Sequence, residues 1–179
     1  MSRTIRRVVT GHDANGRSIV VSDGESPHVF TSPHINLASA EIWSTDDAPV
    51  IPGTGDPMTA PTHDLPAIGG SRFRVVEMPP GERMVVAGGD AAAGMAGYAE
   101  HSPGIMAGMN PDNPGMHVTD TIDYGIVLSG AVALELDDGV TVELGPGDCV
   151  VQNGTMHAWR VRGDEPCVMV FIMIGATRS

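Results

Sequence analysis

The stretch HVTDTIDYGIVLSG, residues 117–130, decides the fold because it reads as one strand with two unlike faces. Side chains two residues apart on a strand share a face. The odd-numbered and even-numbered positions therefore form two sets: His117, Thr119, Thr121, Asp123, Gly125 and Val127, against Tyr124, Ile126 and Leu128. The first set is polar at its start and small further along, which predicts the inside of a barrel that holds a ligand. The second set is predicted to pack on another sheet.

Short β-rich segments of similar length follow this stretch and are divided by Gly, Asp and Pro. They are AVALELDDG (131–139), VTVELGPGD (140–148), CVVQNGT (149–155), MHAWRVRGDEP (156–166) and CVMVFIMIGA (167–176). Strands at this spacing, joined by tight turns, are typical of an antiparallel sandwich or barrel. The abundance of Gly and Pro, 23 and 14 residues, agrees with many turns. The predicted fold class is all-β.

The N-terminal part adds three features to this barrel. Two β-branched runs, TIRRVVT and SIVVSDG, flank the turn pair Asn15-Gly16 and predict a hairpin. Residues 46–70 form a Pro/Gly-rich arm that cannot make a long regular element. Residues 81–114 are predicted to be a loop that covers a pocket, with one or two helical turns in it. We expect one domain, in which residues 1–70 pack as hairpin and arm on a barrel of residues 71–179.

Charge and hydropathy exclude several classes of partner. The formal net charge of -12 would repel a phosphate backbone, so nucleic acid is not an expected partner. The longest apolar run, CVMVFIMIGA, is too short to span a bilayer, so we expect no membrane contact and a soluble, cytoplasmic protein. Cys149 and Cys167 lie in apolar runs and are predicted to be buried, reduced thiols without a chemical role.

The stretch at 117–130 resembles the first motif of the cupin superfamily, H-x-H, three or four residues, E, six residues, G. His117, Asp123 and Gly130 match its first histidine, its acid and its glycine, and Thr119 stands at the second histidine. The second motif, a G-D strand followed by P-x-G-x-x-H, is similar to GDCVVQNGTMHAW. Gly147, Asp148, Gly154 and His157 take its fixed positions, and Gln152 stands at the proline. The resemblance covers residues 116–175 and implies a jelly-roll barrel, the double-stranded β-helix, with the N-terminal hairpin and arm added.

In the family, the two histidines, the acid and the late histidine bind a divalent metal. The resemblance therefore implies a site made of His117, Asp123 and His157, two imidazoles and one carboxylate, which suits Fe, Mn, Ni or Zn. The alternative is a polar network without metal, in which Asp123 bonds the hydroxyls of Thr119 and Thr121. Small cupins of this kind form homodimers, and we expect one here, with the arm as a means of exchange.

Two classes of function follow, and the sequence leaves both open. The first is an enzyme acting on a small organic acid or an aromatic, polyketide-like compound, with metal chemistry of the decarboxylase, isomerase, dehydratase or dioxygenase type. Without metal, His157 or His117 would be the acid or base, Asp123 would set the tautomer and Thr119 would orient the substrate. The second class is a barrel that binds a small ligand without turnover. The residues expected to contact the ligand are Arg74, Tyr98, Gln152 and Trp159.

Overall fold

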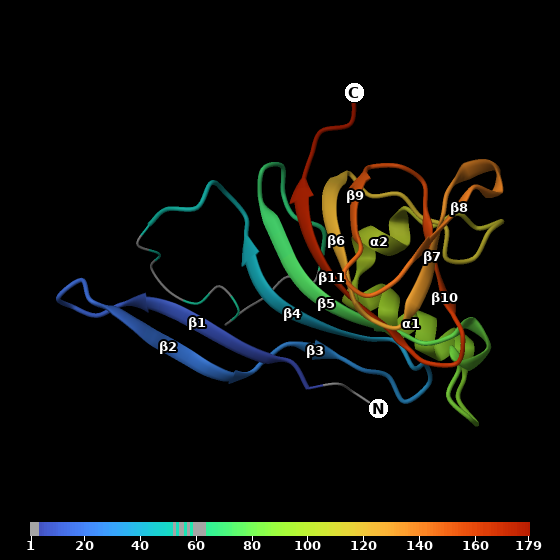
Figure 1. Ribbon diagram of the computed structural model, residues 1–179, viewed down its shortest axis with the longest axis horizontal. Coiled ribbons are helices and arrows are strands. Elements are labelled where there is room, and N and C mark those ends of the chain that lie inside the picture. The colour runs from blue at the N-terminus through green and yellow to red at the C-terminus, as the bar shows by residue number, and fades with distance from the viewer. Residues whose placement is uncertain (1–3, 52, 54–55, 57, 59–63) are drawn as a thin grey trace.

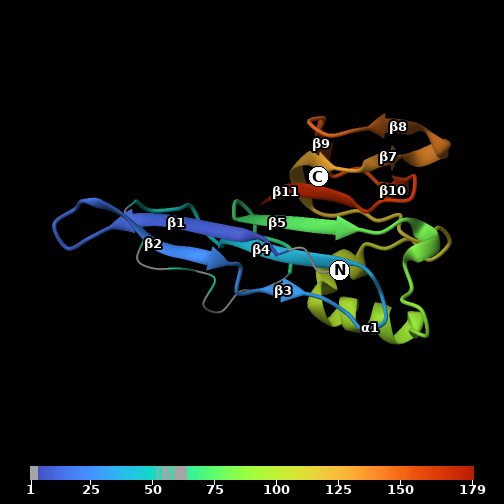
Figure 2. The same ribbon diagram turned by 60° about the horizontal axis from the view of Figure 1, so that its bottom comes forward.

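The structure is a computed structural model that describes residues 4–51, 53, 56, 58 and 64–179. The chain begins with a hairpin of β1 (Arg6–His12) and β2 (Ser18–Glu25). Its turn is the predicted one: Gly16 has φ +77°, and the Asp13 carboxylate accepts hydrogen bonds from the amides of Asn15 and Arg17. Within the described residues β1 and β2 pair only with each other, and Figures 1 and 2 show this ribbon extending beyond the barrel.

The largest sheet has six strands, and every neighbouring pair in it is antiparallel. In spatial order they are β3 (Val29–Phe30), β4 (Ala38–Thr45), β5 (Ser71–Met78), β11 (Cys167–Gly175), β6 (Thr121–Ser129) and β9 (Cys149–Asn153). The N-terminal part of the chain thus contributes β4 to this sheet, where β4 pairs with β5. Part of the predicted arm, including His63, lies outside the described residues.

A second sheet of three strands faces the first and completes the barrel (Figure 1). It contains β10 (Ala158–Arg162), β7 (Ala131–Glu135) and β8 (Thr141–Leu144). The core between the sheets is made of inward-facing side chains: Val127, Val132, Cys167, Met169, Phe171 and Met173. These observations confirm the prediction of an all-β barrel.

The alternation predicted for residues 117–130 is confirmed on one face of β6 and is wrong on the other. Thr121, Asp123 and Val127 are buried, as the prediction required. Tyr124 and Leu128 are instead 45% and 46% exposed, so this face of β6 looks outward and is not covered by a second sheet. The six-stranded sheet has one covered and one open face along β6, which is common for antiparallel sheets.

The segment between β5 and β6 is more helical than predicted. After a short 3-10 turn, η2 (Gly81–Arg83), it forms α1 (Ala91–His101), about three turns, and α2 (Pro103–Ala107). The missed signal is Asp90, whose carboxylate caps α1 by accepting from the amides of Ala92 and Ala93. Gly94 weakens a helix but is required here, because a Cβ would lie 2.4 Å from Cγ2 of Ile35.

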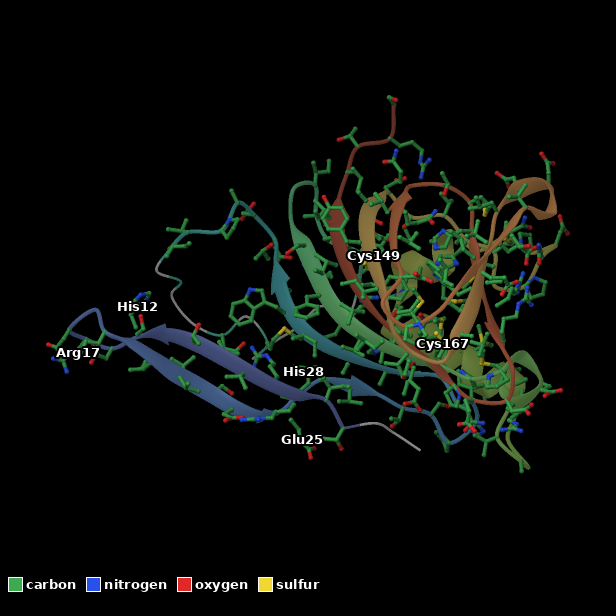
Figure 3. The ribbon with its side chains drawn as sticks, viewed as in Figure 1. His12, Arg17, Glu25, His28, Cys149 and Cys167 are labelled. Atoms are coloured by element: carbon green, nitrogen blue, oxygen red, sulfur yellow. The ribbon has the colours of Figure 1, made fainter. Side chains whose placement is uncertain are left out.

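The remaining expectations concern the cysteines and the membrane. Cys167 is buried as predicted, but Cys149 is exposed, because it lies at the start of an edge strand of the sheet. Figure 3 labels both thiols in the barrel, with His12 and Arg17 far away at the outer end of the hairpin. No helix in the part of the chain that the structure describes is both long and apolar enough to cross a bilayer.

Candidate functional site

A cavity of about 670 Å³ lies between the barrel and the helical segment that precedes β6. Its polar lining includes the cluster predicted from the sequence: His117, Thr119, Asp123 and His157, together with Arg74. Much of the remaining wall is methionine: Met78, Met84, Met95, Met106, Met109 and Met173. Three aromatic residues, Tyr98, Trp159 and Phe171, also line it. A cavity of this size, mostly apolar with a few grouped polar side chains, is typical of a small-molecule site.

The two histidines are held together by their own backbones. The amide of His117 donates to the carbonyl of His157 and the amide of His157 donates to the carbonyl of His117, each at 2.9 Å. The two ring centroids lie 4.4 Å apart. Trp159 meets His157 edge-on at 5.6 Å between centroids and packs against Phe171 on its other side. The two sequence motifs therefore meet at this pair of residues.

Backbone carbonyls fix the tautomer of both imidazoles. Nδ1 of His117 lies 2.9 Å from the carbonyl oxygen of Gly115, and Nδ1 of His157 lies 3.0 Å from that of Thr155. Since a carbonyl only accepts, each Nδ1 must carry the proton, and Nε2 is left as an acceptor. Asp123 does not set these tautomers, contrary to the prediction for a metal-free site.

Burial keeps both imidazoles neutral. It lowers the pKa of His117, and the hydrogen bond to Gly115 offsets this only in part. Burial also lowers the pKa of His157 to about 4, and the neighbouring His117 contributes to the decrease. At neutral pH the cavity therefore presents two uncharged rings.

Asp123 is the acidic group of the cluster and is only 5% exposed. It projects from β6, where its Cα pairs with those of Gln152 and Met173 on the neighbouring strands. Burial raises its pKa to about 6, although a hydrogen bond from Thr121 and the charge of Arg74 act in the opposite direction. Its Oδ1 atom is buried and has no hydrogen-bond partner among the described residues. A buried carboxylate oxygen without a partner is costly unless a ligand uses it.

The cluster has only part of what a metal site needs. Two neutral imidazoles and a carboxylate have suitable donor chemistry. However, Thr119 is buried and its hydroxyl is bonded to that of Thr121 at 2.7 Å. Among residues 4–51, 53, 56, 58 and 64–179, no three His, Cys, Asp or Glu side chains are placed to hold one ion. The metal implied for His117, Asp123 and His157 therefore stays a prediction.

Three of the four predicted substrate contacts line the cavity: Arg74, Tyr98 and Trp159. Arg74 is 4% exposed, and its Nε lies 3.2 Å from Oε1 of the buried Glu41. Gln152 is not among the described residues that line the cavity. Its side-chain amide instead donates to the carbonyl and the hydroxyl of Thr155. The structure thus separates Gln152 from the other predicted contacts.

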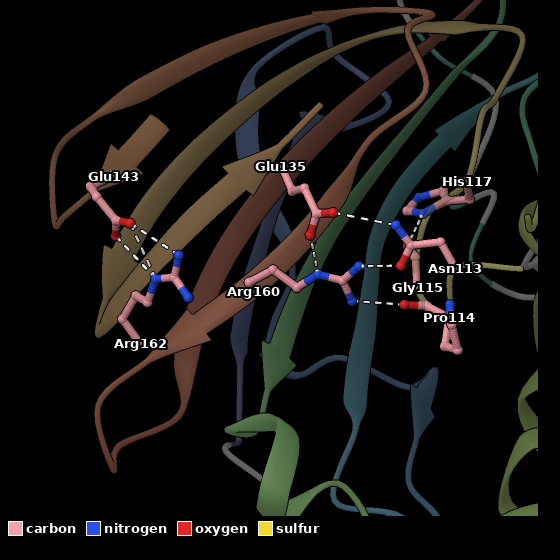
Figure 4. Close-up of polar contacts among 8 residues, drawn as sticks. All are labelled: Asn113, Pro114, Gly115, His117, Glu135, Glu143, Arg160 and Arg162. Atoms are coloured by element: carbon pink, nitrogen blue, oxygen red, sulfur yellow. Dashed lines mark hydrogen bonds and ion pairs between the residues drawn. The ribbon is translucent and has the colours of Figure 1, made fainter. Parts of the chain in front are cut away.

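The sequence did not point to Arg160, which also lines the cavity. Figure 4 shows its guanidinium bonded to Glu135 and to the segment Asn113–Pro114. These partners lie 25 to 47 residues away along the chain. No local pattern could have identified them, because the contacts depend on how β7, β10 and the preceding loop meet in space.

Comparison with known proteins identifies the family of the chain. Residues 106–173 match the family described as Cupin domain. The chain is 31% identical to phomopsin biosynthesis cluster protein C' of Diaporthe leptostromiformis, over 97% of this chain and 80% of that protein. It is 28% identical to the cupin-domain-containing oxidoreductase fogC of Aspergillus ruber, over 97% of this chain and 73% of that protein. A cupin 2 conserved barrel domain protein from Rhodopseudomonas palustris has a TM-score of 0.44 at 10% identity, over 96% of this chain and 83% of that chain. This chain belongs to the cupin family.

Proposed function

We propose that this cupin is an enzyme that transfers a proton within a small organic molecule bound in the cavity. The relatives support the general role: one is named for a biosynthesis cluster and another as an oxidoreductase. The observation that carries the proposal is Asp123, a residue of the cavity wall whose buried Oδ1 has no hydrogen-bond partner among the described residues. Such an oxygen is a ready proton acceptor once a ligand excludes water.

The lining indicates what kind of molecule would fit. Methionine side chains are flexible and polarizable, and they make favourable contacts with aromatic rings. Together with Trp159 and Phe171 they form a wall for an apolar, ring-containing body. Asp123 lies on β6, and His157 directly precedes β10 and is bridged to His117, so the reacting polar group of the ligand would face Asp123 and His157. We therefore propose an aromatic or polyketide-like carbonyl compound as the substrate.

Four polar residues of the site have a part in this reaction. The carboxylate of Asp123 removes a proton from the carbon next to the carbonyl, and the electron pair of that C–H bond forms the new double bond of an enolate. Arg74 is the nearby cation that favours the developing negative charge. The Nε2 atoms of His117 and His157 accept hydrogen bonds from ligand hydroxyls. In a substrate with a further C=C bond next to that carbon, the negative charge of the enolate extends to the far end of this bond. Protonated Asp123 then returns the proton to that far carbon, the C=C bond moves into conjugation with the carbonyl, and the net change is an isomerisation.

A deuterium-exchange screen tests the proposal without knowledge of the natural substrate. The protein is incubated in D₂O with aryl ketones and cyclic diketones, and the loss of the C–H signal next to the carbonyl is followed by NMR. Enzyme-dependent exchange that saturates with ligand concentration is expected for at least one ring-containing compound. Binding of such compounds without any exchange would overturn the enzyme and favour a barrel that only binds its ligand.

An oxidoreductase is the second candidate, and the name of the Aspergillus relative favours it. A bound ion would supply Lewis-acid chemistry or activate dioxygen. If Fe, Mn, Ni or Zn binds through the predicted residues, elemental analysis of protein purified without chelator finds close to one ion per chain. The variants His157→Ala and Asp123→Ala then each lose it. Exchange activity that depends on this ion would replace the metal-free proposal.

The exposed hairpin supports a homodimer. A two-stranded ribbon is only marginally stable alone, yet Val8, Val20 and Val21 on β1 and β2 are 50%, 58% and 52% exposed. We propose that a second copy covers them. Light scattering of the wild-type protein at micromolar concentration is expected to give twice the mass of one chain. The Val20→Lys/Val21→Lys double variant is expected to give the mass of one chain. The matched control is Val151→Lys, which changes a 66% exposed valine on β9 and should leave the dimer intact. A wild-type mass of one chain would contradict the dimer.

A further inference from the structure

Arg160 joins the barrel to the loop that precedes the site histidine. Its Nε donates to Oε2 of Glu135 at 2.6 Å, its Nη1 to the carbonyl of Pro114 at 2.7 Å and its Nη2 to Oδ1 of Asn113 at 2.9 Å. All three nitrogens of the guanidinium are thus used, each by a different residue (Figure 4). The planar fork of an arginine can satisfy such a set, whereas a lysine cannot.

The contacts form a closed ring of interactions. Nδ2 of Asn113 donates to Oε1 of Glu135 at 3.3 Å, so Arg160 and Asn113 each contact the same carboxylate. These two donors lower the pKa of Glu135, which keeps the carboxylate charged. The Arg160 and Glu135 side chains are only 31% and 22% exposed. Charge-assisted bonds in a half-buried setting hold their partners more firmly than an exposed pair does.

The loop held by this ring leads directly to His117. Gly115 follows the bonded Pro114 and has φ +89°, a left-handed conformation that favours glycine. A Cβ at this position would lie 3.0 Å from Nη1 of Arg160, so the guanidinium rests against the glycine. The carbonyl of Gly115 is the group that accepts the hydrogen bond from Nδ1–H of His117.

We infer that Arg160 is a positioning residue for His117. By fixing Asn113 and Pro114 it fixes the Gly115 carbonyl, and this carbonyl keeps the His117 proton on Nδ1. Nε2 is then always the acceptor available to a ligand. The inference deepens the proposed function and rests on it only for the use that a ligand makes of Nε2, because the tautomer itself can be observed without a ligand.

The chain offers a matched control two residues further along the same strand. Arg162 pairs with Glu143 at 3.1 Å, and both side chains are exposed, 45% and 65% (Figure 4). Among the described residues, its Nε and Nη2 donate hydrogen bonds only to this carboxylate. Replacement of Arg162 therefore removes an arginine–glutamate pair between β10 and β8 without removing any contact to the loop of residues 113–115.

The experiment compares Arg160→Gln with Arg162→Gln by NMR of ¹⁵N-labelled histidine, without ligand. The His117 signals are assigned by their loss in His117→Gln. In wild type and in Arg162→Gln, Nδ1 of His117 should appear protonated and Nε2 unprotonated. In Arg160→Gln the two shifts should move toward each other, as a mixture of tautomers requires. Unchanged His117 shifts in Arg160→Gln with an intact fold would overturn the inference.

Two further variants keep the test decisive if Arg160→Gln does not fold. Gly115→Ala disturbs the same contact from the loop side, and Arg160→Lys retains the charge without the fork. Both are expected to shift the His117 tautomer in the same direction, Arg160→Lys by less. An unchanged tautomer in both would overturn the role of Arg160. Failure of the exchange screen with a shifted tautomer would instead contradict the proposed function alone.

Discussion

Replacing Asp123 by asparagine is expected to slow the exchange reaction by a factor of about 10²–10⁴, the usual contribution of a general base. Asparagine has nearly the same size and shape, so the cavity stays intact. Its amide oxygen, however, cannot hold a proton in the way a carboxylate does, and no other carboxylate lines the cavity among the described residues. The measurement is the rate of deuterium incorporation into the best compound of the screen.

Asp120→Asn is the matched control for this substitution. Asp120 lies three positions earlier, is exposed and pairs with Arg178 at 2.6 Å, outside the cavity. Its replacement should change the exchange rate by less than about twofold, because an exposed ion pair contributes little. Equal loss in both variants would mean that folding, and not the base, had been changed. An unimpaired Asp123→Asn variant would remove Asp123 from the mechanism.

Gly130→Ala is expected to destabilise the protein strongly. Gly130 closes the first motif with φ +78°, a conformation that costs about 1–2 kcal/mol for an L-residue. In addition, a Cβ would lie 2.5 Å from the carbonyl oxygen of Pro166 and 2.8 Å from Cα of Cys167. Both are backbone atoms of the segment entering β11, and overpacking of this kind costs about 1–3 kcal/mol. The free energy of unfolding should fall by about 2–5 kcal/mol, the sum of the two, as measured by urea titration.

Gly139→Ala separates the two causes of this loss. Gly139 has φ +72°, almost the same backbone conformation, but no atom lies within 4 Å of the position of its Cβ. This variant should therefore lose only the conformational part, about 1–2 kcal/mol. If both variants lose the same free energy, the close approach of Pro166 and Cys167 to Gly130 has no energetic weight.

The regular part of the fold could be predicted because each strand carries its own pattern. The Asn15-Gly16 turn and the buried face of β6 follow from local rules, namely turn chemistry and a period of two residues. The outward face of β6 could not be predicted in this way, because apolar residues such as Leu128 also occur on exposed faces. Periodicity shows that two faces differ but does not show what covers each of them.

The sequence predicted which side chains make up the candidate site, but it did not predict the hydrogen bonds that orient them. His117, Asp123 and His157 were identified because two separate motifs place them on neighbouring parts of a barrel. The residues that orient them were missed, since they act through backbone atoms. The carbonyls of Gly115 and Thr155 fix the imidazoles, and no side-chain pattern encodes a carbonyl.

The two backbone hydrogen bonds between His117 and His157 hold the positions of the site independently of the side chains that occupy them. Both bonds are made by main-chain atoms, so they would persist with almost any pair of side chains at these two positions. The distance between the two positions is a property of the barrel, whereas the functional groups placed there are interchangeable. A barrel built in this way can exchange one reaction for another through single substitutions at these positions, without having to fold differently.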